Sequence, residues 1–436
     1  MKQVLRDIIE DQKVFLRREN TVERAFPERL LHNGLVVVIS GVRRCGKSVL
    51  LQQIRGRMPS SDCFLNFDDD RLANFRQQHF QDLYEVFIEM YGEQDCFFFD
   101  EIQNVEGWEH FVKRLYNMGK KVFVTGSNAR MLSRELGTLL TGCYIAYELF
   151  PFSFAESLTL SGEQRLLTSR DGSRNKSLLQ SRFREYLYRG GMPMYLSTGD
   201  PQVLKTMYDN ILYRDVLVRN QINNERELKE MVYFLMSNIG KPVTYSSLAG
   251  VIGVKNPSTA KAYMEFVENT YLLFTLSKMD VSVKAQLRNP KKVYCIDNAV
   301  AMSLGFRFSK DEGRMLENLV LVELKRRGKE VFYHNDGSNE CDFVVRDGFV
   351  VSEAVQVCYD LGNPLTRERE LKGLLSAMQA YGLDEGLLLT DSQQETVEMD
   401  CRRIRIVPAW EWLVGEGGPA GELKIRREKR KMKREE

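Results

Sequence analysis

The segment LVVVISGVRRCGKSVLLQQI (residues 35–54) decides the fold class of this chain. An apolar run ends at Ser40, the pattern G-x-x-x-x-G-K-[ST] extends from Gly41 to Ser48, and an amphipathic run follows from Val49. A strand, a glycine-rich loop and a helix in that order are typical of a P-loop, whose backbone N–H groups bind phosphate. The segment therefore predicts an α/β domain that binds ATP.

The residues of this loop have distinct expected roles. The glycines let successive N–H groups converge on phosphate oxygens, and the helix N-terminus adds positive potential. Lys47 is expected to reach the β- and γ-phosphates and to act in catalysis, and the Ser48 hydroxyl is expected to ligate Mg²⁺. The residues expected to contact the nucleotide are Gly41, Val42, Arg43, Arg44, Cys45, Gly46, Lys47, Ser48 and Val49.

A second apolar run ends in two carboxylates. Cys96–Phe99 precedes Asp100 and Glu101, about 50 residues after Lys47, which is typical of a Walker B strand. Asp100 is expected to hold Mg²⁺, directly or through water, and Glu101 to orient and deprotonate the attacking water. The sequence thus predicts Mg²⁺-dependent hydrolysis of ATP.

Polar residues also follow the next apolar run, Lys121–Thr125. If this strand lies between the two Walker strands, Asn128, or else Ser127, is expected to hydrogen-bond the lytic water and so sense the γ-phosphate.

The organisation along the chain is that of a multidomain α/β protein. Short apolar runs alternate with amphipathic stretches, which favours a parallel sheet wrapped by helices. The expected strands are Leu35–Ser40, Cys63–Phe67, Cys96–Phe99, Lys121–Thr125 and Tyr144–Leu149. The expected domains are a helical lead-in (1–34), a P-loop core (35–153), a helical lid or connector (154–225), a winged helix (226–296), a mixed α/β domain (297–415) and a basic flexible tail (416–436).

The expected winged helix suggests nucleic acid as a partner. Three helical patterns are followed by apolar strands, and basic side chains outnumber acidic ones in this region. The helix expected to read double-stranded DNA begins at Asn256 and carries Lys261. The other basic residues of this region include Lys255, Lys284, Arg288, Lys291 and Lys292. Winged helices also bind proteins, so a protein partner stays open.

The composition, charge and hydropathy of the chain argue against several classes of protein. Hydrophobic residues make up 43% and charged residues 28% of the 436, as in an ordinary globular protein, and a net charge of +2 indicates no class of partner. No apolar run approaches the length of a membrane span, so no membrane contact and a cytoplasmic location are expected. The eight cysteines are scattered without metal-ligand spacing, and most are expected to be buried apolar residues.

Several motifs together give the chain a family resemblance. The loop 41–48, the stretch Asp100–Gln103 followed by Trp108, residues 125–128, the stretch Leu149–Phe154 and the stretch Gly190–Pro193 resemble the prokaryotic AAA-type ATPases that carry a C-terminal domain of unknown function. The resemblance covers the chain to about Val414. It implies a P-loop core joined to a winged helix and to a C-terminal region similar to the PD-(D/E)XK nuclease fold.

The sequence departs from this family in the ATPase core. Cys143 stands where the family usually has an arginine after Thr141-Gly142. Arg130 and Arg134 are alternatives for stabilising charge on the transferred phosphate. Slow turnover, or an arginine from a neighbouring chain, is therefore expected.

A second departure lies in the nuclease-like region. Glu317 and Asp342 match the nuclease pattern, but Gln356 and Cys358 replace its acid and its lysine. An amide and a thiol hold Mg²⁺ poorly and supply no ammonium, so an inactive module is predicted. An ATP-dependent nuclease using Glu317, Asp342 and either Glu323 or Glu340 stays open as a third hypothesis.

The first functional hypothesis is an ATPase that changes conformation on DNA. The alternative is a nucleotide-controlled switch that binds a protein partner or another copy of itself, with slow hydrolysis.

Overall fold

The computed structural model describes residues 1–415 except 16–20, 60–61, 128–139, 169–171 and 306–310. The basic tail from 416 lies outside the described residues. The chain forms two compact units. Unit 1 comprises Met1–Leu149 with Asn269–Tyr271, and unit 2 comprises Phe150–Glu268 and Leu272–Glu436.

Unit 1 is built on a parallel sheet of five strands in the order β2-β3-β4-β1-β5. All five strands expected from the apolar runs are present, with ends shifted by at most one residue. They are β1 (Val36–Ser40), β2 (Cys63–Asn66), β3 (Cys96–Asp100), β4 (Lys121–Gly126) and β5 (Tyr144–Glu148). Because β4 pairs with both β1 and β3, its carboxyl end lies between the P-loop strand and the strand that carries Asp100.

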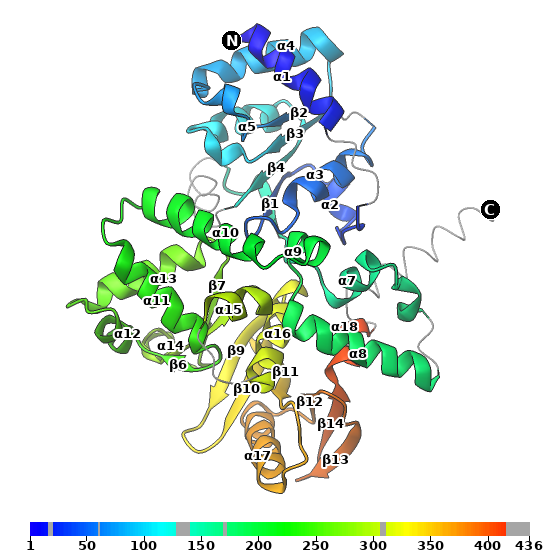
Figure 1. Ribbon diagram of the computed structural model, residues 1–436, viewed down its shortest axis with the longest axis vertical. Coiled ribbons are helices and arrows are strands. Elements are labelled where there is room, and N and C mark those ends of the chain that lie inside the picture. The colour runs from blue at the N-terminus through cyan, green and yellow to red at the C-terminus, as the bar shows by residue number, and fades with distance from the viewer. Residues whose placement is uncertain (16–20, 60–61, 128–139, 169–171, 306–310, 416–436) are drawn as a thin grey trace. The chain divides into compact units, whose positions relative to one another are not determined.

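Helices surround this sheet (Figure 1). Residues 21–27 are not helical, so the expected helical lead-in is only partly helical. Leu5 and Ile8 of the first helix belong to the same hydrophobic core as β2 and β3. The helices of unit 1 are α1 (Lys2–Phe15), α2 (Arg29–His32), α3 (Lys47–Arg55), α4 (Phe80–Tyr91), α5 (Trp108–Asn117) and the short 3₁₀ helices η1 (Asp70–Leu72), η2 (Gln77–His79) and η3 (Ile102–Asn104).

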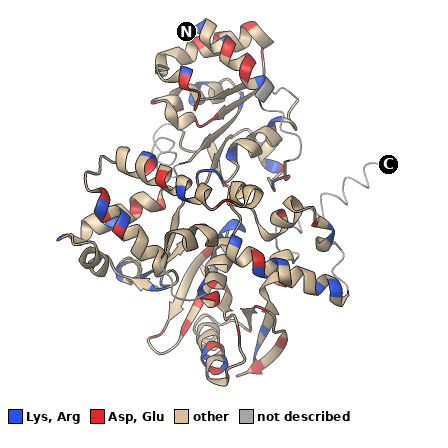
Figure 2. Ribbon diagram, in the orientation of Figure 1, with Lys and Arg blue, Asp and Glu red and all other residues tan. Residues whose placement is uncertain are grey.

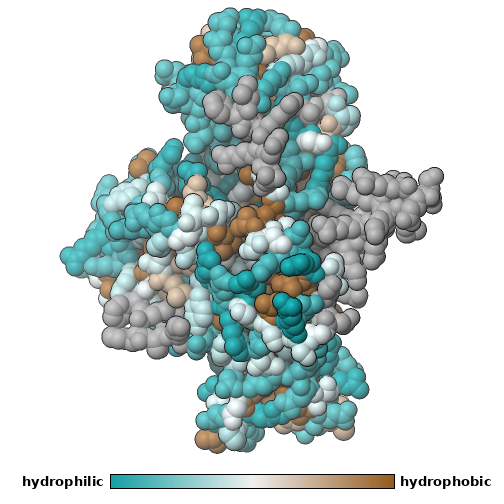
Figure 3. Space-filling model, turned by 45° about the vertical axis from the view of Figure 1, so that its right-hand side comes forward, coloured by the Kyte–Doolittle hydropathy of each residue, from teal (hydrophilic) through white to brown (hydrophobic). Residues whose placement is uncertain are grey.

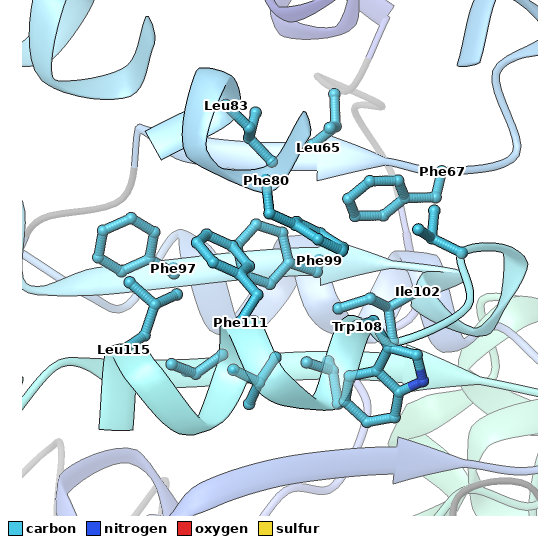
Figure 4. Packing of buried hydrophobic residues seen from close by; sticks show 14 of the residues in the cluster. Leu65, Phe67, Phe80, Leu83, Phe97, Phe99, Ile102, Trp108, Phe111 and Leu115 are labelled. Carbon is cyan, nitrogen blue, oxygen red and sulfur yellow. The ribbon is translucent and has the colours of Figure 1, made fainter. Parts of the chain in front are cut away.

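The core on one face of this sheet is rich in aromatic side chains (Figure 4). Phe97 and Phe99 of β3 point into it, and Phe80 of α4 stacks on Phe111 of α5 with ring centroids 4.7 Å apart. Phe98 points to the opposite face, where it is also fully buried. Successive strand residues face opposite sides, so a run of three phenylalanines anchors both faces of the strand that carries Asp100 and Glu101.

Unit 2 begins with helices, as the periodicity after residue 154 predicts. The helical path breaks after Arg189 at the glycine pair, also as expected. These helices are α7 (Phe154–Leu160), the 3₁₀ helix η4 (Gln164–Leu167), α8 (Ser173–Arg189), α9 (Pro193–Thr198), α10 (Gln202–Asn210) and the π-helix η5 (Ile211–Val218).

A small antiparallel sheet with the strand order β6-β8-β7 follows, together with four helices. The three helices expected in this region are present. Strand β6 and helix α14 are additional, and both are too short to give a periodic pattern. The elements are α11 (Glu225–Ser237), β6 (Pro242–Val243), α12 (Tyr245–Val251), α13 (Pro257–Glu268), β7 (Leu273–Ser277), α14 (Val283–Arg288) and β8 (Lys291–Cys295).

The rest of unit 2 contains a mixed sheet of six strands in the order β13-β14-β12-β11-β10-β9. The first four strands along the chain were expected, but the edge pair β13 and β14 was not. In β14, arginines alternate with Ile404 and Ile406, so few apolar residues mark this strand in the sequence. The elements are α15 (Asn298–Leu304), α16 (Glu312–Arg326), β9 (Glu330–Asn335), β10 (Glu340–Asp347), β11 (Val350–Val357), α17 (Pro364–Tyr381), β12 (Glu385–Thr390), β13 (Glu395–Met399), β14 (Arg402–Pro408) and α18 (Ala409–Val414).

Two of the family motifs meet in unit 2. Gly191 pairs with Phe152 through a backbone hydrogen bond of 2.7 Å from the Phe152 N–H to the Gly191 carbonyl. The carboxylate of Asp297 accepts from the Gly191 N–H and caps α15 through the N–H groups of Ala299 and Val300. At the glycine pair, the backbone after α8 therefore lies close to that of Phe152, and Asp297 links this segment to the start of α15.

We expect Gly191→Ala to lower the free energy of unfolding of unit 2 by about 2–3 kcal/mol. A Cβ at this position would lie 2.0 Å from the Phe152 carbonyl oxygen, and a backbone atom cannot move aside as a flexible side chain can. Urea denaturation measures the change. Gly250→Ala is the matched control, because a Cβ there meets nothing within 4 Å and should be neutral or slightly stabilising. Equal stability of the two variants would contradict the prediction.

Asp297 should make the stability of unit 2 depend on pH. Burial raises the pKa of its carboxyl to about 6, above its ordinary value near 4. The folded state then binds a proton more readily than the unfolded state, so stability rises as pH falls through 6. Relative to Asp297→Asn, the wild type should gain about 1 kcal/mol of unfolding free energy between pH 7.5 and pH 5. If the difference in unfolding free energy between the wild type and Asp297→Asn stayed constant with pH, the prediction would be wrong.

Candidate active site

The P-loop of unit 1 connects β1 to α3, as the motif predicts. A Cβ on Gly41, whose φ is +148°, would lie 2.2 Å from the Leu149 carbonyl oxygen, so no other residue fits there. Gly46 precedes the helix with φ +103°. Both conformations suit glycine, and they bring the loop around the N-terminus of α3.

Lys47 is buried across this loop. Its Nζ donates to the carbonyl oxygens of Gly41 at 3.0 Å and Val42 at 3.1 Å. Its side chain thus bends back over the loop.

Two buried residues outside the motif hydrogen-bond to the loop and to the last residue of β1. The Arg24 guanidinium donates to the Cys45 carbonyl oxygen at 2.8 Å, and the Tyr271 hydroxyl donates to Ser40 Oγ at 2.7 Å. Neither was expected from the sequence. No local signal marks them, because they come from residues 21–27 and from Asn269–Tyr271.

The carboxylate of Asp100 is buried beside the start of α3. Thr125 Oγ1 donates to Asp100 Oδ1 at 2.5 Å. Burial, followed by the charge of Glu101, raises the pKa of Asp100 to about 6, while hydrogen bonds from Thr125 and Ser48 and the charge of Lys47 oppose that rise. The structure therefore brings together Ser48 and Asp100, the two predicted metal ligands.

Glu101 is held next to this pair in an unusual backbone conformation. Its φ is +51°, and its N–H donates to Thr125 Oγ1 at 2.9 Å. Its carboxylate accepts from Gln103 Nε2 at 2.5 Å. Thr125 links both acids to β4, a role that the sequence did not reveal because it depends on strand order.

A hydroxyl and a carboxylate form a donor set that fits Mg²⁺. In nucleotide sites this ion uses one or two protein oxygens and completes its shell with phosphate and water. A larger cluster of protein ligands is therefore not required. Indeed, the described residues contain no group of three or more His, Cys, Asp or Glu side chains placed to hold a metal.

The predicted sensor is only partly described. Asn128, Arg130 and Arg134 lie outside the described residues. Ser127, the alternative to Asn128, is buried at the end of β4, and its Oγ has no hydrogen-bond partner among the described residues.

Cys143 lies just before β5, and its Sγ accepts a hydrogen bond from Lys113 Nζ at 2.9 Å. It belongs to the hydrophobic core of unit 1, as do Cys63 and other residues of the sheet. The expectation of buried cysteines is confirmed for seven of the eight, and Cys401 is exposed.

The basic residues predicted to contact DNA are not all available. Lys291 and Lys292 are buried, so the inclusion of these two among the DNA-contacting residues was wrong. Lys261 pairs with Glu265 on its own helix at 3.7 Å. Of the basic residues predicted to contact DNA, Lys255, Lys284 and Arg288 are exposed, and Lys261 is exposed as well despite its pairing. Acidic and basic segments are mixed along the helices (Figure 2).

The residues of the nuclease hypothesis separate into two groups. Glu317, Glu340 and Asp342 come together around Lys292. Glu323 does not join them, because its carboxylate pairs with Arg326 and Arg327, so its inclusion as an alternative was wrong.

Among the described residues, no helix is long and apolar enough to cross a membrane. The face drawn in Figure 3 is mostly hydrophilic.

Comparison with known proteins identifies related chains. A family model described as an AAA domain matches residues 33–158, and a domain of unknown function, DUF8612, matches residues 180–311. The uncharacterized protein MJ1544 of Methanocaldococcus jannaschii is 31% identical over 430 residues, covering 94% of this chain and 95% of that protein. An uncharacterized protein of Haemophilus influenzae is 28% identical over 417 residues, covering 92% and 99%.

Solved structures resemble the chain only loosely. The Aeropyrum pernix Orc1 protein in complex with DNA aligns with a TM-score of 0.27 at 10% identity, over 70% of this chain and 91% of that one. Cdc6p from Pyrobaculum aerophilum aligns with a TM-score of 0.23 at 12% identity, over 70% and 97%. Scores this low support no argument about this chain.

Proposed function

Because this chain belongs to the same family as MJ1544 of Methanocaldococcus jannaschii and carries an AAA domain, we propose that it is a Mg²⁺-dependent ATPase that couples hydrolysis to a conformational change on double-stranded DNA. ATP binding and a P-loop ATPase core follow from the AAA domain. The roles of single residues and the coupling to DNA are the proposal.

The proposed chemistry uses side chains of unit 1. Backbone N–H groups of residues 41–49 bind the phosphates, and Lys47 exchanges its two loop carbonyls for β- and γ-phosphate oxygens. Ser48 and Asp100 hold Mg²⁺, which neutralises charge on the phosphates when it is bound. Glu101 accepts a proton from the attacking water.

The observation that carries this proposal is the pair of hydrogen bonds at Thr125. This residue donates to Asp100 and accepts from the Glu101 N–H. One side chain of β4 therefore sets the position of both acids, the metal ligand and the base. The two roles differ in environment, since Asp100 is 1% exposed and Glu101 is only partly buried.

Residues at the end of β4 are proposed to sense the γ-phosphate. Asn128 is the first candidate. The buried and unpartnered Oγ of Ser127 supports the second, because a buried hydroxyl without a partner costs free energy that a ligand oxygen would recover.

The coupling to DNA rests on the exposed basic residues Lys255, Lys284 and Arg288. It is tested by measuring ATP hydrolysis with and without double-stranded DNA at several salt concentrations. Stimulation by DNA that weakens with salt, and that is lost when these three residues are replaced by alanine, is the expected result. Hydrolysis that does not respond to DNA would overturn the coupling and leave the ATPase itself intact.

A second candidate function is a nucleotide-controlled switch for a protein partner or a second copy of this chain. The burial of Lys291 and Lys292 favours it, because it removes two of the expected basic groups from the surface. Single-turnover hydrolysis distinguishes the two functions. A rate that is slow, indifferent to DNA and higher at higher protein concentration would indicate a switch completed by another copy.

A further inference from the structure

A lysine is buried among three carboxylates in unit 2. Lys292 of β8 is 2% exposed, and its Nζ lies 3.3 Å from Glu317 Oε1, 2.7 Å from Glu340 Oε1 and 3.2 Å from Asp342 Oδ1. Glu317 belongs to α16, and the other two acids belong to β10. Three separate elements therefore meet at one ammonium group.

Other polar groups of the protein also donate hydrogen bonds to these carboxylates. The Tyr294 hydroxyl donates to Glu317 Oε1 at 2.7 Å, and the Val357 N–H donates to Asp342 Oδ2 at 3.1 Å. Asn335 Nδ2 donates to Glu340 Oε2 at 3.0 Å. Each carboxylate thus has a protein donor in addition to the lysine.

A divalent metal does not fit this arrangement. A metal bound to Glu317 and Asp342 would need to lie about 2.0–2.6 Å from their oxygens, which is the space that the lysine ammonium uses. The two cations would repel each other strongly in a buried site. The next polar side chain, Gln356, is neutral, and it accepts from the Asp342 N–H and donates to Glu370.

We propose that Lys292 is the resident cation of this pocket, which takes no divalent metal and instead fastens β8 to α16 and β10. The pocket that the nuclease hypothesis assigns to Mg²⁺ is then an ion-pair joint between the three-stranded and the six-stranded sheets. A neighbouring contact reinforces the same joint, because the Met279 N–H donates to the Tyr333 carbonyl oxygen of β9 at 2.8 Å. The Tyr333 hydroxyl donates back to the Pro290 carbonyl at 2.8 Å.

The first test asks whether the wild-type chain binds a divalent metal in this pocket. Mn²⁺ binding is measured by electron paramagnetic resonance on the full-length protein without nucleotide, beside Asp342→Asn. The proposal expects the two proteins to bind Mn²⁺ equally up to about 1 mM, since any weak site elsewhere is common to both. Binding by the wild type that disappears in Asp342→Asn would overturn it.

The second test removes the cation. Lys292→Met should lower the melting temperature by about 10 °C, because the buried Asp342 and the partly buried Glu317 and Glu340 then face one another without a counter-charge. Lys291→Met is the matched control, since Lys291 lies on the same strand and bonds to neutral oxygens of Ser277 and Gln286. If Lys291→Met and Lys292→Met melted at the same temperature, the proposal would be overturned.

Two further measurements separate a charge effect from a packing effect. Adding Asp342→Asn to Lys292→Met removes one of the stranded charges and should recover part of the lost melting temperature. Millimolar Mn²⁺ should raise the melting temperature of Lys292→Met by more than that of the wild type, because a freed acidic pocket accepts a hard cation. If neither the Asp342→Asn substitution nor Mn²⁺ raises the melting temperature of Lys292→Met, Lys292 is not the resident cation of the pocket.

Discussion

Glu101→Gln is expected to bind ATP as the wild type does and to hydrolyse it about 10²- to 10⁴-fold more slowly. Glutamine preserves the size of the side chain and can keep the contact with Gln103, but it cannot accept a proton from water. Asp100, Ser48 and Lys47 are untouched, so nucleotide affinity should not change. Equilibrium binding of ATP and single-turnover hydrolysis measure the two quantities separately.

The control for this variant is Glu106→Gln, which alters an exposed carboxylate five residues further along the same unit. It should hydrolyse ATP at the wild-type rate. If Glu101→Gln retained that rate as well, the catalytic base would lie elsewhere and the proposed role of Glu101 would have to be abandoned.

Lys47→Ala is expected to weaken ATP binding by about 100-fold or more and to abolish measurable turnover. The ammonium is buried and already hydrogen-bonded across the loop to Gly41 and Val42, so little reorganisation is needed before it meets phosphate oxygens. Alanine removes the charge and every donor. Titration with a fluorescent ATP analogue measures the affinity, and steady-state hydrolysis measures the turnover.

Unfolding must be separated from loss of function in this variant. Lys2→Ala is a suitable control, because it removes a lysine of the same unit that pairs at the surface with Glu85 and Glu89. It should keep wild-type affinity. A Lys47→Ala protein that melts normally and still binds ATP at wild-type affinity would contradict the assignment of the phosphate site.

Short-range patterns were enough to predict much of this protein. A few neighbouring residues encode each of these patterns: the strand, loop and helix of residues 35–54, and the apolar strand before Asp100. Burial of their apolar side chains favours the same local structure. The five strands of unit 1 were predicted within one residue for this reason. The same patterns missed β14, where arginines alternate with Ile404 and Ile406, and its neighbour β13, which has only two apolar residues. They also missed β6 and α14, which are too short to be periodic.

The sequence by itself determined the P-loop, the two acids of β3 and the α/β class, because each is encoded in consecutive residues. Only the tertiary structure decided which distant groups complete the sites. Thr125 joins Asp100 to Glu101 because β4 lies between β1 and β3, and Lys292 lies among acids from two other elements although its sequence context suggested a DNA contact. Strand order and burial arise from contacts between residues far apart in the chain, and no local pattern records them.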